Sequence, residues 1–394
     1  MSEKKDGINS YKNFFSYTIG RLSKITGSQD TIHNLLLLAK GLLKYIKLHY
    51  TLFGHYDGEL MQQPSKATLR ETSGTFSDFL KKNELEILIP MMDFQSYMMW
   101  AYGPIDEIGT LYNLMYKTPN AILPLVYNIF NIFSGMNGDH NDLYFLKKGF
   151  QHLWKTVVEK EDLNIQFNSS ISRITRTNSS IDIQYKTVVN GSKVNEKCDF
   201  LIWTPPMPSF VKFVSDPSDE EKNLFNGLTP HVLVGTLTNQ TETIRNTPFV
   251  GFAKTVEEKI DGGVLSEFDY EGILTVCDKE CALTNDQYNN MVNSSRIVLT
   301  GQIYNNMINV SESNQVVIDH YHNGFNTSKM DILKTEQWNY FYRWSPSELS
   351  EGNQWKVFNI QGMQRTWYAG ASVSFESVKN IVDYNTLLLK QSEI

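Results

Sequence analysis

Cysteine is rare in this chain, and its rarity argues against a fold held together by disulfides. Among 394 residues there are three cysteines, Cys198, Cys277 and Cys281. Small secreted domains depend on dense disulfide bonds, whereas a chain of this length with 41% apolar residues can bury a large core without them. The sequence therefore indicates a reducing compartment.

Positive charge and long apolar runs are also scarce. Asp and Glu outnumber Lys and Arg by 43 to 36, and basic residues form only short runs such as Lys147-Lys148, so a nucleic-acid partner is not expected. The most apolar stretch, residues 120–133, is broken by Pro124 and is shorter than the ~20 residues that cross a bilayer. The polar start, MSEKKDGINS, does not have the apolar core of a secretory signal. These features predict a soluble cytoplasmic protein without a transmembrane segment.

Several enzyme signatures are missing. The chain contains no G-x-x-x-x-G-K-[ST], no G-x-S-x-G, no H-E-x-x-H, and no G-x-G-x-x-G after a strand. Cys277 and Cys281 have no second cysteine pair with zinc spacing. In a strand, His320 and His322 would share one face, but two donors are fewer than a zinc site needs. We therefore prefer an exposed polar edge to a metal site there, and predict no metal.

The first third of the chain is helical in pattern. Residues 31–50 place leucines and isoleucines on one stripe of a helix, and Thr75 precedes Phe76 as a helix cap. Residues 85–102 are rich in methionine and aromatic residues. This run is typical of a core, with a ligand-facing wall as the alternative.

After residue 142 the pattern becomes mixed. It predicts a loop and a turn at Gly149, a helix to residue 160, and strands at residues 164–167, 171–176 and 181–189. A hairpin at Asn190-Gly191 follows, then a buried strand at residues 200–204 that Pro205-Pro206 ends. Residues 232–342 are rich in strands, with a charged or helical interlude at residues 314–333.

The end of the chain, QGMQRTWYAGASVSFESVKNIVDYN, predicts a strand, a tight turn at Gly370 and an amphipathic helix. Glycine followed by the small residues Ala371 and Ser372 lets a ligand approach the backbone. The alternative is an ordinary connection between a strand and a helix.

Three segments resemble the flavin-containing amine oxidase superfamily. Residues 143–206, with SSISRITR and KCDFLIWTPP, resemble the middle segment of its FAD-binding domain, and NIQGMQRTWYAGASVSFESVKNIVDYNTLLLK resembles the last segment. GTFSDFLKKNELEILIPMMDFQSYMMWAYGPIDEI is similar to substrate-domain helices of a microbial branch of FAD/NAD(P)-binding oxidoreductases related to amine oxidases.

The resemblance implies a mixed α and β fold in which a remnant of a Rossmann-like FAD domain alternates with a substrate domain of helices packed on a mixed or antiparallel sheet. Residues 1–142 would be the helical part of the substrate domain and residues 211–354 its sheet. Residues 143–210 and 355–394 would be the middle and C-terminal segments of the FAD domain.

The resemblance also implies a cofactor, FAD, and the residues that contact it. Ile171 would pair its backbone with the adenine edge. The segment after the strand at 200–204 would pass the ADP portion, and the last helix would point its free N–H groups at the flavin. The implied cofactor contacts are Ile171, Thr204, Pro205, Trp367, Gly370, Ala371, Ser377 and Val378. Met98 and Tyr102 would line the pocket for a small-molecule substrate, and Tyr102 and Trp367 would lie nearest the flavin ring.

Two departures from the family pattern shape the functional prediction. Gly370 is followed by Ala371 where the family usually has an acidic residue, although the microbial branch often has none there. The N-terminal βαβ unit with its glycine-rich turn has no counterpart, so we expect exposed apolar surface and weakened cofactor binding.

The sequence thus predicts an FAD-dependent oxidoreductase that transfers hydride from a small organic substrate to flavin and whose activity is impaired. The alternatives are a non-catalytic remnant that serves as a binding module and a truncated gene product. No catalytic base is assigned.

Overall fold

The structure is a computed structural model. It describes residues 2–5, 8–11, 14–55, 62–134, 150–189, 191–240, 249–269, 296–325 and 330–392. The predicted turn at Gly149 and the residues Asn190, Cys277 and Cys281 lie outside this described part.

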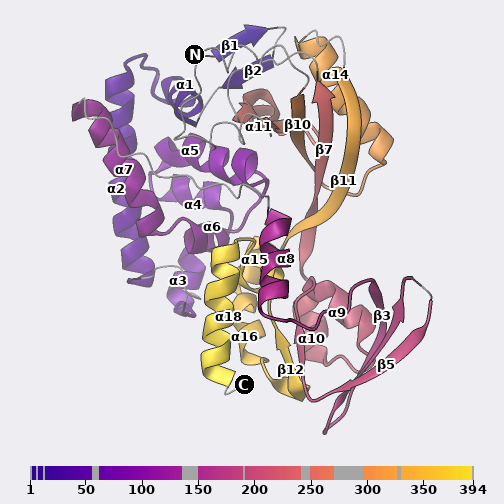
Figure 1. The fold of residues 1–394 in the computed structure, drawn as a ribbon. Coiled ribbons are helices and arrows are strands. Elements are labelled where there is room, and N and C mark those ends of the chain that lie inside the picture. Colours follow the sequence, from indigo (N-terminus) through magenta and orange to yellow (C-terminus); the bar gives the residue numbers. More distant parts are fainter. Residues whose placement is uncertain are drawn as a thin grey trace.

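A group of helices forms one side of the molecule (Figure 1). They are α1 (Phe14–Thr26), α2 (Thr31–Phe53), α3 (Lys66–Glu71), α4 (Phe76–Lys82), η1 (Glu86–Leu88), α5 (Ile89–Asp93), the π-helix η2 (Phe94–Met99), α6 (Thr110–Tyr116) and α7 (Pro119–Ser134). Asp30 caps α2 by accepting a hydrogen bond from the Ile32 N–H at 2.9 Å. The predicted cap at Thr75 is confirmed, because its side chain accepts from the Asp78 N–H.

An antiparallel sheet of seven strands stands beside these helices, in the order β1-β2-β8-β9-β10-β7-β11. Its strands are β1 (Ser2–Lys5), β2 (Ile8–Tyr11), β7 (Thr229–Gln240), β8 (Phe249–Phe252), β9 (Val264–Asp269), β10 (Arg296–Tyr304) and β11 (Met330–Arg343). The short helix α11 (Ala253–Glu258) joins β8 to β9, and α14 (Val310–Phe325) packs on β11, β7 and β9.

Helix α14 corrects one premise of the sequence analysis. The segment Asp319-His320-Tyr321-His322 is helical, so its two histidines do not alternate as in a strand. The His320 ring packs edge-on against Phe252, with ring centroids 4.3 Å apart. Within the described ranges, no group of three or more His, Cys, Asp or Glu side chains could hold a metal ion.

The remaining elements form a third region at the end of the molecule that carries the C-terminus (Figure 1). A meander contains β3 (Ser169–Arg176), β4 (Ile181–Thr187) and β5 (Lys193–Cys198), and β6 (Leu201–Trp203) pairs in parallel with β12 (Thr366–Tyr368). The helices here are α8 (Phe150–Lys160), α9 (Met207–Phe213), α10 (Asp219–Phe225), α15 (Pro346–Ser350), α16 (Asn353–Asn359), η3 (Met363–Arg365), α17 (Ala371–Ser374) and α18 (Val378–Ser392).

Two strand predictions in this region need correction. Residues 164–167 form no strand, because no neighbour in the described chain pairs with them. The predicted strand at 200–204 exists as β6, but it is only partly buried: Trp203 is buried, whereas Phe200 and Ile202 are each 45% exposed. Among the described residues, β6 pairs with one strand, β12.

The predicted mixed α and β fold, with helices packed on a mixed or antiparallel sheet, is confirmed, and the sheet beside the helices is antiparallel. The run at residues 85–102 is largely core, with Met91, Met92, Phe94 and Met98 buried. In the described residues, no helix combines the length and the apolar character that crossing a bilayer requires.

Candidate functional site

A cavity of about 480 Å³ lies between the helices and one face of the seven-stranded sheet. The helical side supplies Met98, Trp100, Ala101, Tyr102 and Tyr116. The sheet supplies Leu233, Val234, Gly235, Leu265, Ser266, Phe268, Leu299, Thr300, Gly301, Trp338 and Tyr340, and the segment before α18 supplies Glu376 and Ser377.

The positions of the lining residues follow from their local structure. Met98 lies in η2, and its side chain passes over Gly251, where there is no room for a Cβ. Tyr102 packs between Phe341 and Phe375, with ring centroids 4.6 Å and 5.2 Å away. Gly235 and Gly301 also line the cavity, and the Trp338 ring lies so close over Gly235 that an added Cβ would stand 3.1 Å from it.

The cavity is aromatic and apolar, and its lining includes the three tyrosines Tyr102, Tyr116 and Tyr340. Burial raises the pKa of Tyr116 to about 12 and raises the pKa values of Tyr102 and Tyr340 further, so all three hydroxyls remain protonated. Burial also raises the pKa of Glu376, although its carboxyl group accepts hydrogen bonds from the backbone N–H groups of Phe341 and Tyr342. Among the described residues that line the cavity, Glu376 is the one acidic residue, and none is Lys, Arg or His.

The turn at Gly370 lies where the two parallel strands end. The Ala369 N–H donates to the Trp203 carbonyl at 2.9 Å, which extends the pairing of β12 with β6. Gly370 has φ 89° and ψ −176°, a conformation available essentially only to glycine. The chain can therefore turn at this point while its backbone stays close to the end of β6.

Two helices follow this turn, where the sequence predicts one. α17 is a single short turn, and Phe375 at φ 114° separates it from α18. Ser377 precedes α18: its carbonyl accepts from the Ile381 N–H at 3.0 Å, and its hydroxyl accepts from the Asn380 N–H at 3.5 Å. The start of α18 thus reaches the cavity through Glu376 and Ser377.

The structure brings some of the predicted site residues together. Met98, Tyr102 and Ser377 line the cavity, and Val378 is the first residue of α18. Thr204 and Pro205 are exposed at the end of β6. Gly370 approaches the Thr204 carbonyl, and Ala371 begins the short helix beside it.

Two other predicted residues lie elsewhere. Ile171 is in β3, opposite Tyr185 of β4. Trp367 is in β12 opposite Ile202, and its ring meets Phe200 edge-on at 5.8 Å. Trp367 does not line the cavity.

Sequence analysis did not select Tyr340, Trp338 or Glu376. Trp338 and Tyr340 are two residues apart on β11, so they point to the same face of the sheet. The sequence indicates that Trp338 and Tyr340 share one face of a strand. It does not indicate which face of the sheet packs against the helices. Glu376 is an isolated carboxylate in the sequence. Only the fold brings it to the aromatic wall of the cavity, which consists of Trp100, Tyr102, Tyr116, Trp338 and Tyr340.

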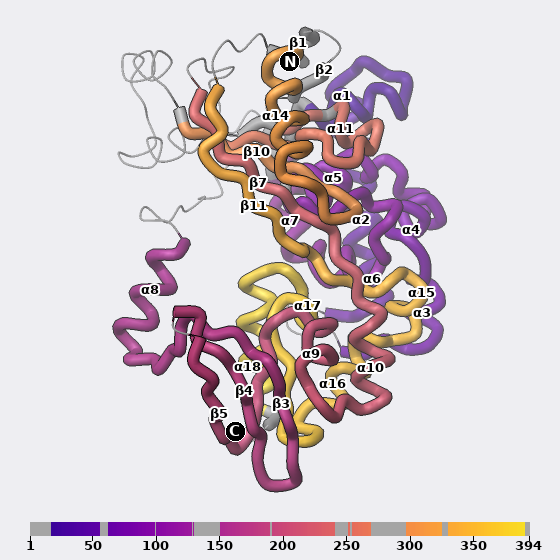
Figure 2. Tube along the Cα trace, turned by 90° about the vertical axis from the view of Figure 1, so that its right-hand side faces the viewer, coloured from indigo at the N-terminus to yellow at the C-terminus, as the bar shows by residue number. Residues whose placement is uncertain are grey.

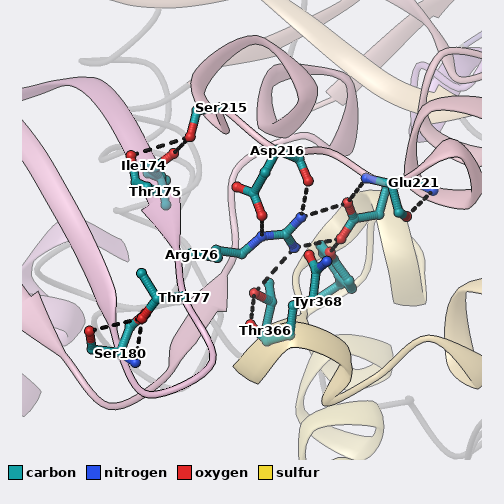
Figure 3. Close-up of polar contacts among 12 residues, drawn as sticks. Ile174, Thr175, Arg176, Thr177, Ser180, Ser215, Asp216, Glu221, Thr366 and Tyr368 are labelled. Carbon is teal, nitrogen blue, oxygen red and sulfur yellow. Dashed lines mark hydrogen bonds and ion pairs between the residues drawn. The ribbon is translucent and has the colours of Figure 1, made fainter.

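A polar network centred on the buried side chain of Arg176 connects the elements around the β6-β12 strand pair (Figure 3). Arg176 of β3 donates from Nη1 to Glu221 Oε1 at 2.6 Å and from Nη2 to Glu221 Oε2 at 2.9 Å. It also contacts Asp216 and Thr366, and the Tyr368 hydroxyl donates to Glu221. The network therefore joins the meander, α10 and β12.

The comparisons with known proteins show the fold. No family model matches the chain, and no curated protein matches it in sequence. The structure is similar to the crystal structure of a fatty acid isomerase from P. acnes, which produces CLA, with a TM-score of 0.71 at 17% identity, covering 100% of this chain and 89% of that chain. It is also similar to wild-type putrescine oxidase bound to putrescine, with a TM-score of 0.56 at 9% identity and the same coverage. The chain therefore has the amine-oxidase-like fold that its sequence resembles.

Proposed function

We propose that this chain carries the substrate domain and the ring-binding half of the cofactor site of an FAD-dependent oxidoreductase. Residues 1–142 and 211–354 would form the substrate domain, and residues 143–210 and 355–394 the cofactor-binding part. The observation that carries the proposal is the aromatic cavity that reaches the start of α18, which follows the Gly370 turn at the end of a parallel strand pair.

The ring end of a flavin fits the residues present. An isoalloxazine ring is flat and aromatic, and its pyrimidine edge accepts hydrogen bonds. Trp100, Tyr102 and Tyr340 offer aromatic surface. At the start of α18 the Asn380 N–H donates to the Ser377 hydroxyl, and the N–H groups of Val378 and Lys379 precede it in the first turn, where the helix supplies no backbone acceptor. Gly370 carries no side chain at the point where its backbone approaches the Thr204 carbonyl.

The diphosphate of FAD does not fit the residues at the ends of these strands. Dinucleotide folds hold the diphosphate with a glycine-rich turn at a helix N-terminus, and the sequence contains no G-x-G-x-x-G. At the end of β6 the chain continues as Pro205-Pro206, and two prolines offer no N–H donors. The described residues therefore suit the ring end of the cofactor and not its diphosphate.

When bound, the flavin would supply a two-electron acceptor for hydride from a substrate carbon. The chain's own residues would hold and shield the substrate. Met98, Leu233 and Leu265 exclude water from the apolar part of the cavity. The Tyr340 hydroxyl already donates to the Trp100 carbonyl, and the Tyr102 hydroxyl bonds to that of Tyr340, so the protonated hydroxyl of Tyr116 would donate to the substrate. This division suits a small organic molecule that is apolar or amphipathic.

Riboflavin tests this proposal directly, because it contains the flavin ring and lacks the diphosphate. We expect riboflavin to bind the purified chain, with its fluorescence quenched by the aromatic wall, and FAD to bind no more tightly than riboflavin. Tyr102→Leu should weaken riboflavin binding, whereas Tyr127→Leu, at an exposed position of α7, should not. A chain that binds neither flavin would refute the proposal and favour the non-catalytic binding module.

A further inference from the structure

Strand β11 is the last strand of the seven-stranded sheet, on the side away from helices α1 to α7 (Figure 1). It is 14 residues long and pairs with β7 along its inner edge, and no strand among the described residues pairs with its outer edge. Figure 2 views the molecule from this side and shows β11 running along β7, with α14 beside it. An outer edge of this length offers a row of backbone donors and acceptors to another strand.

The features that usually protect an edge strand are weak in β11. Many edge strands are very short, or carry proline or a lysine that repels a second strand. β11 contains no proline, and its one lysine, Lys334, forms an ion pair with Glu336 at 3.0 Å. The two side chains are 67% and 49% exposed, so their pairing adds little to the stability of one chain. Both charges can therefore exchange partners with a second strand.

The charged pair lies on the same face of the sheet as the cavity. Thr335 points to the other face, where its hydroxyl donates to Asn314 Oδ1 of α14 at 2.6 Å. Lys334 and Glu336 flank Thr335 and alternate with it, so they share a face with Trp338, which lines the cavity. Trp338 is nevertheless 50% exposed. The ion pair and the exposed ring thus form one row along the outer strand.

The charges of this row are complementary to themselves. Two copies related by a twofold axis normal to the sheet would pair the same edge antiparallel, with both cavities on one face. With the axis at Thr335, Lys334 of each copy lies opposite Glu336 of the other, and residues 330–340 of both copies overlap. An axis at Lys334 or at Glu336 would set like charges opposite each other, which destabilises a sheet. The charges therefore favour the register centred on Thr335.

We propose that the outer edge of β11 binds the same edge of a second copy of this chain, antiparallel about Thr335, so that the two sheets become one continuous sheet. The start of β11 in each copy would lie beside Trp338 of the other and cover the exposed part of its ring. Because Trp338 lines the cavity, each copy would then complete the wall of the other's cavity. The inference does not depend on the proposed function, since none of these contacts involves a flavin.

The oligomeric state of the purified full chain tests the proposal. Sedimentation velocity is measured from about 1 μM to about 500 μM, and hydrogen exchange of residues 332–340 is followed at both ends of this range. We expect a dimer to form as the concentration rises, with slower exchange of the β11 amides in the dimer. A chain that stays a monomer throughout the range, or a dimer in which the exchange of these amides is unchanged, overturns the proposal.

Charge reversal at β11 tests the register. Lys334→Glu sets carboxylates opposite each other at two symmetry-related places and should weaken the dimer at least about tenfold. Lys334→Glu combined with Glu336→Lys restores opposite charges and should return the affinity of the dimer to that of the wild type. Lys222→Glu is the matched control, because Lys222 is also an exposed lysine in an ion pair, on α10, and its replacement changes the net charge equally. It should dimerise as the wild type does.

The double variant separates the interface from a structural role of Lys334. Urea unfolding at about 1 μM measures the stability of each variant where the monomer prevails. We expect the double variant to be as stable as the wild type and to dimerise as tightly. If Lys334→Glu leaves the dimer unchanged, or if the double variant dimerises no better than Lys334→Glu, the charges of β11 do not set the register and the proposal is overturned.

Discussion

Gly370 lies so close to Thr204 that a Cβ on Gly370 would stand 2.6 Å from the Thr204 carbonyl oxygen. The contact joins the ends of β12 and β6, two strands separated by more than 160 residues of sequence. Both the conformation of Gly370, at φ 89°, and the absence of space require glycine at this position. The turn that carries the proposed ring site is therefore held by backbone packing.

Gly370→Ala should destabilise the fold by at least about 3 kcal/mol, because the strained backbone costs ~1–3 kcal/mol and the contact with a backbone oxygen adds to it. Urea unfolding of the variant and the wild type measures this loss. Gly27→Ala is the matched control: Gly27 also has a positive φ of 70°, but an added Cβ meets nothing within 4 Å. It should cost only about 1 kcal/mol. Equal costs at the two positions would show that the Thr204 contact is unimportant.

Glu221→Gln should cost about 3 kcal/mol at pH 7, because it leaves the buried guanidinium of Arg176 without its bidentate carboxylate. Glu348→Gln is a close control, since Glu221 and Glu348 both close a capping box and glutamine can also do so. Glu348 has no arginine partner in the described residues, so its replacement should cost under about 1 kcal/mol.

The ion pair between Glu221 and Arg176 predicts that the free energy of unfolding depends on pH. Burial alone would raise the pKa of Glu221, but hydrogen bonds from Arg176 and Tyr368 lower it below its ordinary value. A carboxylate with a lowered pKa stabilises the fold above its unfolded pKa and loses that effect as the pH falls through the folded value. The difference in unfolding free energy between wild type and Glu221→Gln should therefore shrink below about pH 4.5. A difference that is constant from pH 7 to pH 3 would contradict the ion pair.

Much of the fold could be predicted from the sequence where local patterns decide the structure. The stripe of residues 31–50, the cap at Thr75 and the hairpin around Gly191 all depend on neighbouring residues, and each forms as expected. The segment at 164–167 has an equally clear strand pattern and yet forms no strand, since a strand also needs a partner that local sequence does not supply.

The candidate site was predictable only in part for a related reason. Met98, Tyr102 and Ser377 belong to motifs of the resemblance, and the fold gathers them around one cavity. The opposite wall comes from residues of the four strands β7, β9, β10 and β11, and which of their faces meets the helices depends on the long-range order of the sheet. The resemblance of the last segment also implied Trp367, but its ring meets Phe200 edge-on and does not line the cavity.

Lys117 gives a prediction about stability at alkaline pH. Its Nζ is buried and donates to Ser96 Oγ at 2.7 Å and to Asn113 Oδ1 at 2.5 Å, 5.4 Å from the centre of the Trp100 ring. Burial lowers the pKa of Lys117 to about 7, and Asp93 offsets this only in part. Above pH 7 the unfolded chain binds more protons at this lysine than the folded chain, so the stability should rise with pH.

The expected slope is at most about 1.4 kcal/mol per pH unit between pH 7 and 9.5, measured by urea unfolding. Lys117→Met should remove this contribution. Asn113→Asp should remove it as well, because a carboxylate beside Nζ keeps the lysine charged, and the Asn113 Nδ2 has no hydrogen-bond partner to lose. If Asn113→Asp retains the slope of the wild type, another group causes the rise.

The start of α18 offers a test of the ring site that leaves the fold intact. Val378 is the first residue of the helix and is 49% exposed, and proline is well tolerated at the first helical position because that N–H has no partner within the helix. Val378→Pro should therefore change the unfolding free energy by less than about 1 kcal/mol. If that N–H binds the flavin, the variant should weaken riboflavin binding about tenfold, the loss of one hydrogen bond to the ring. Val378→Ala keeps the N–H and should bind riboflavin as the wild type does. Equal affinities for all three proteins would place the flavin away from the start of α18, and the aromatic wall alone would then define the site.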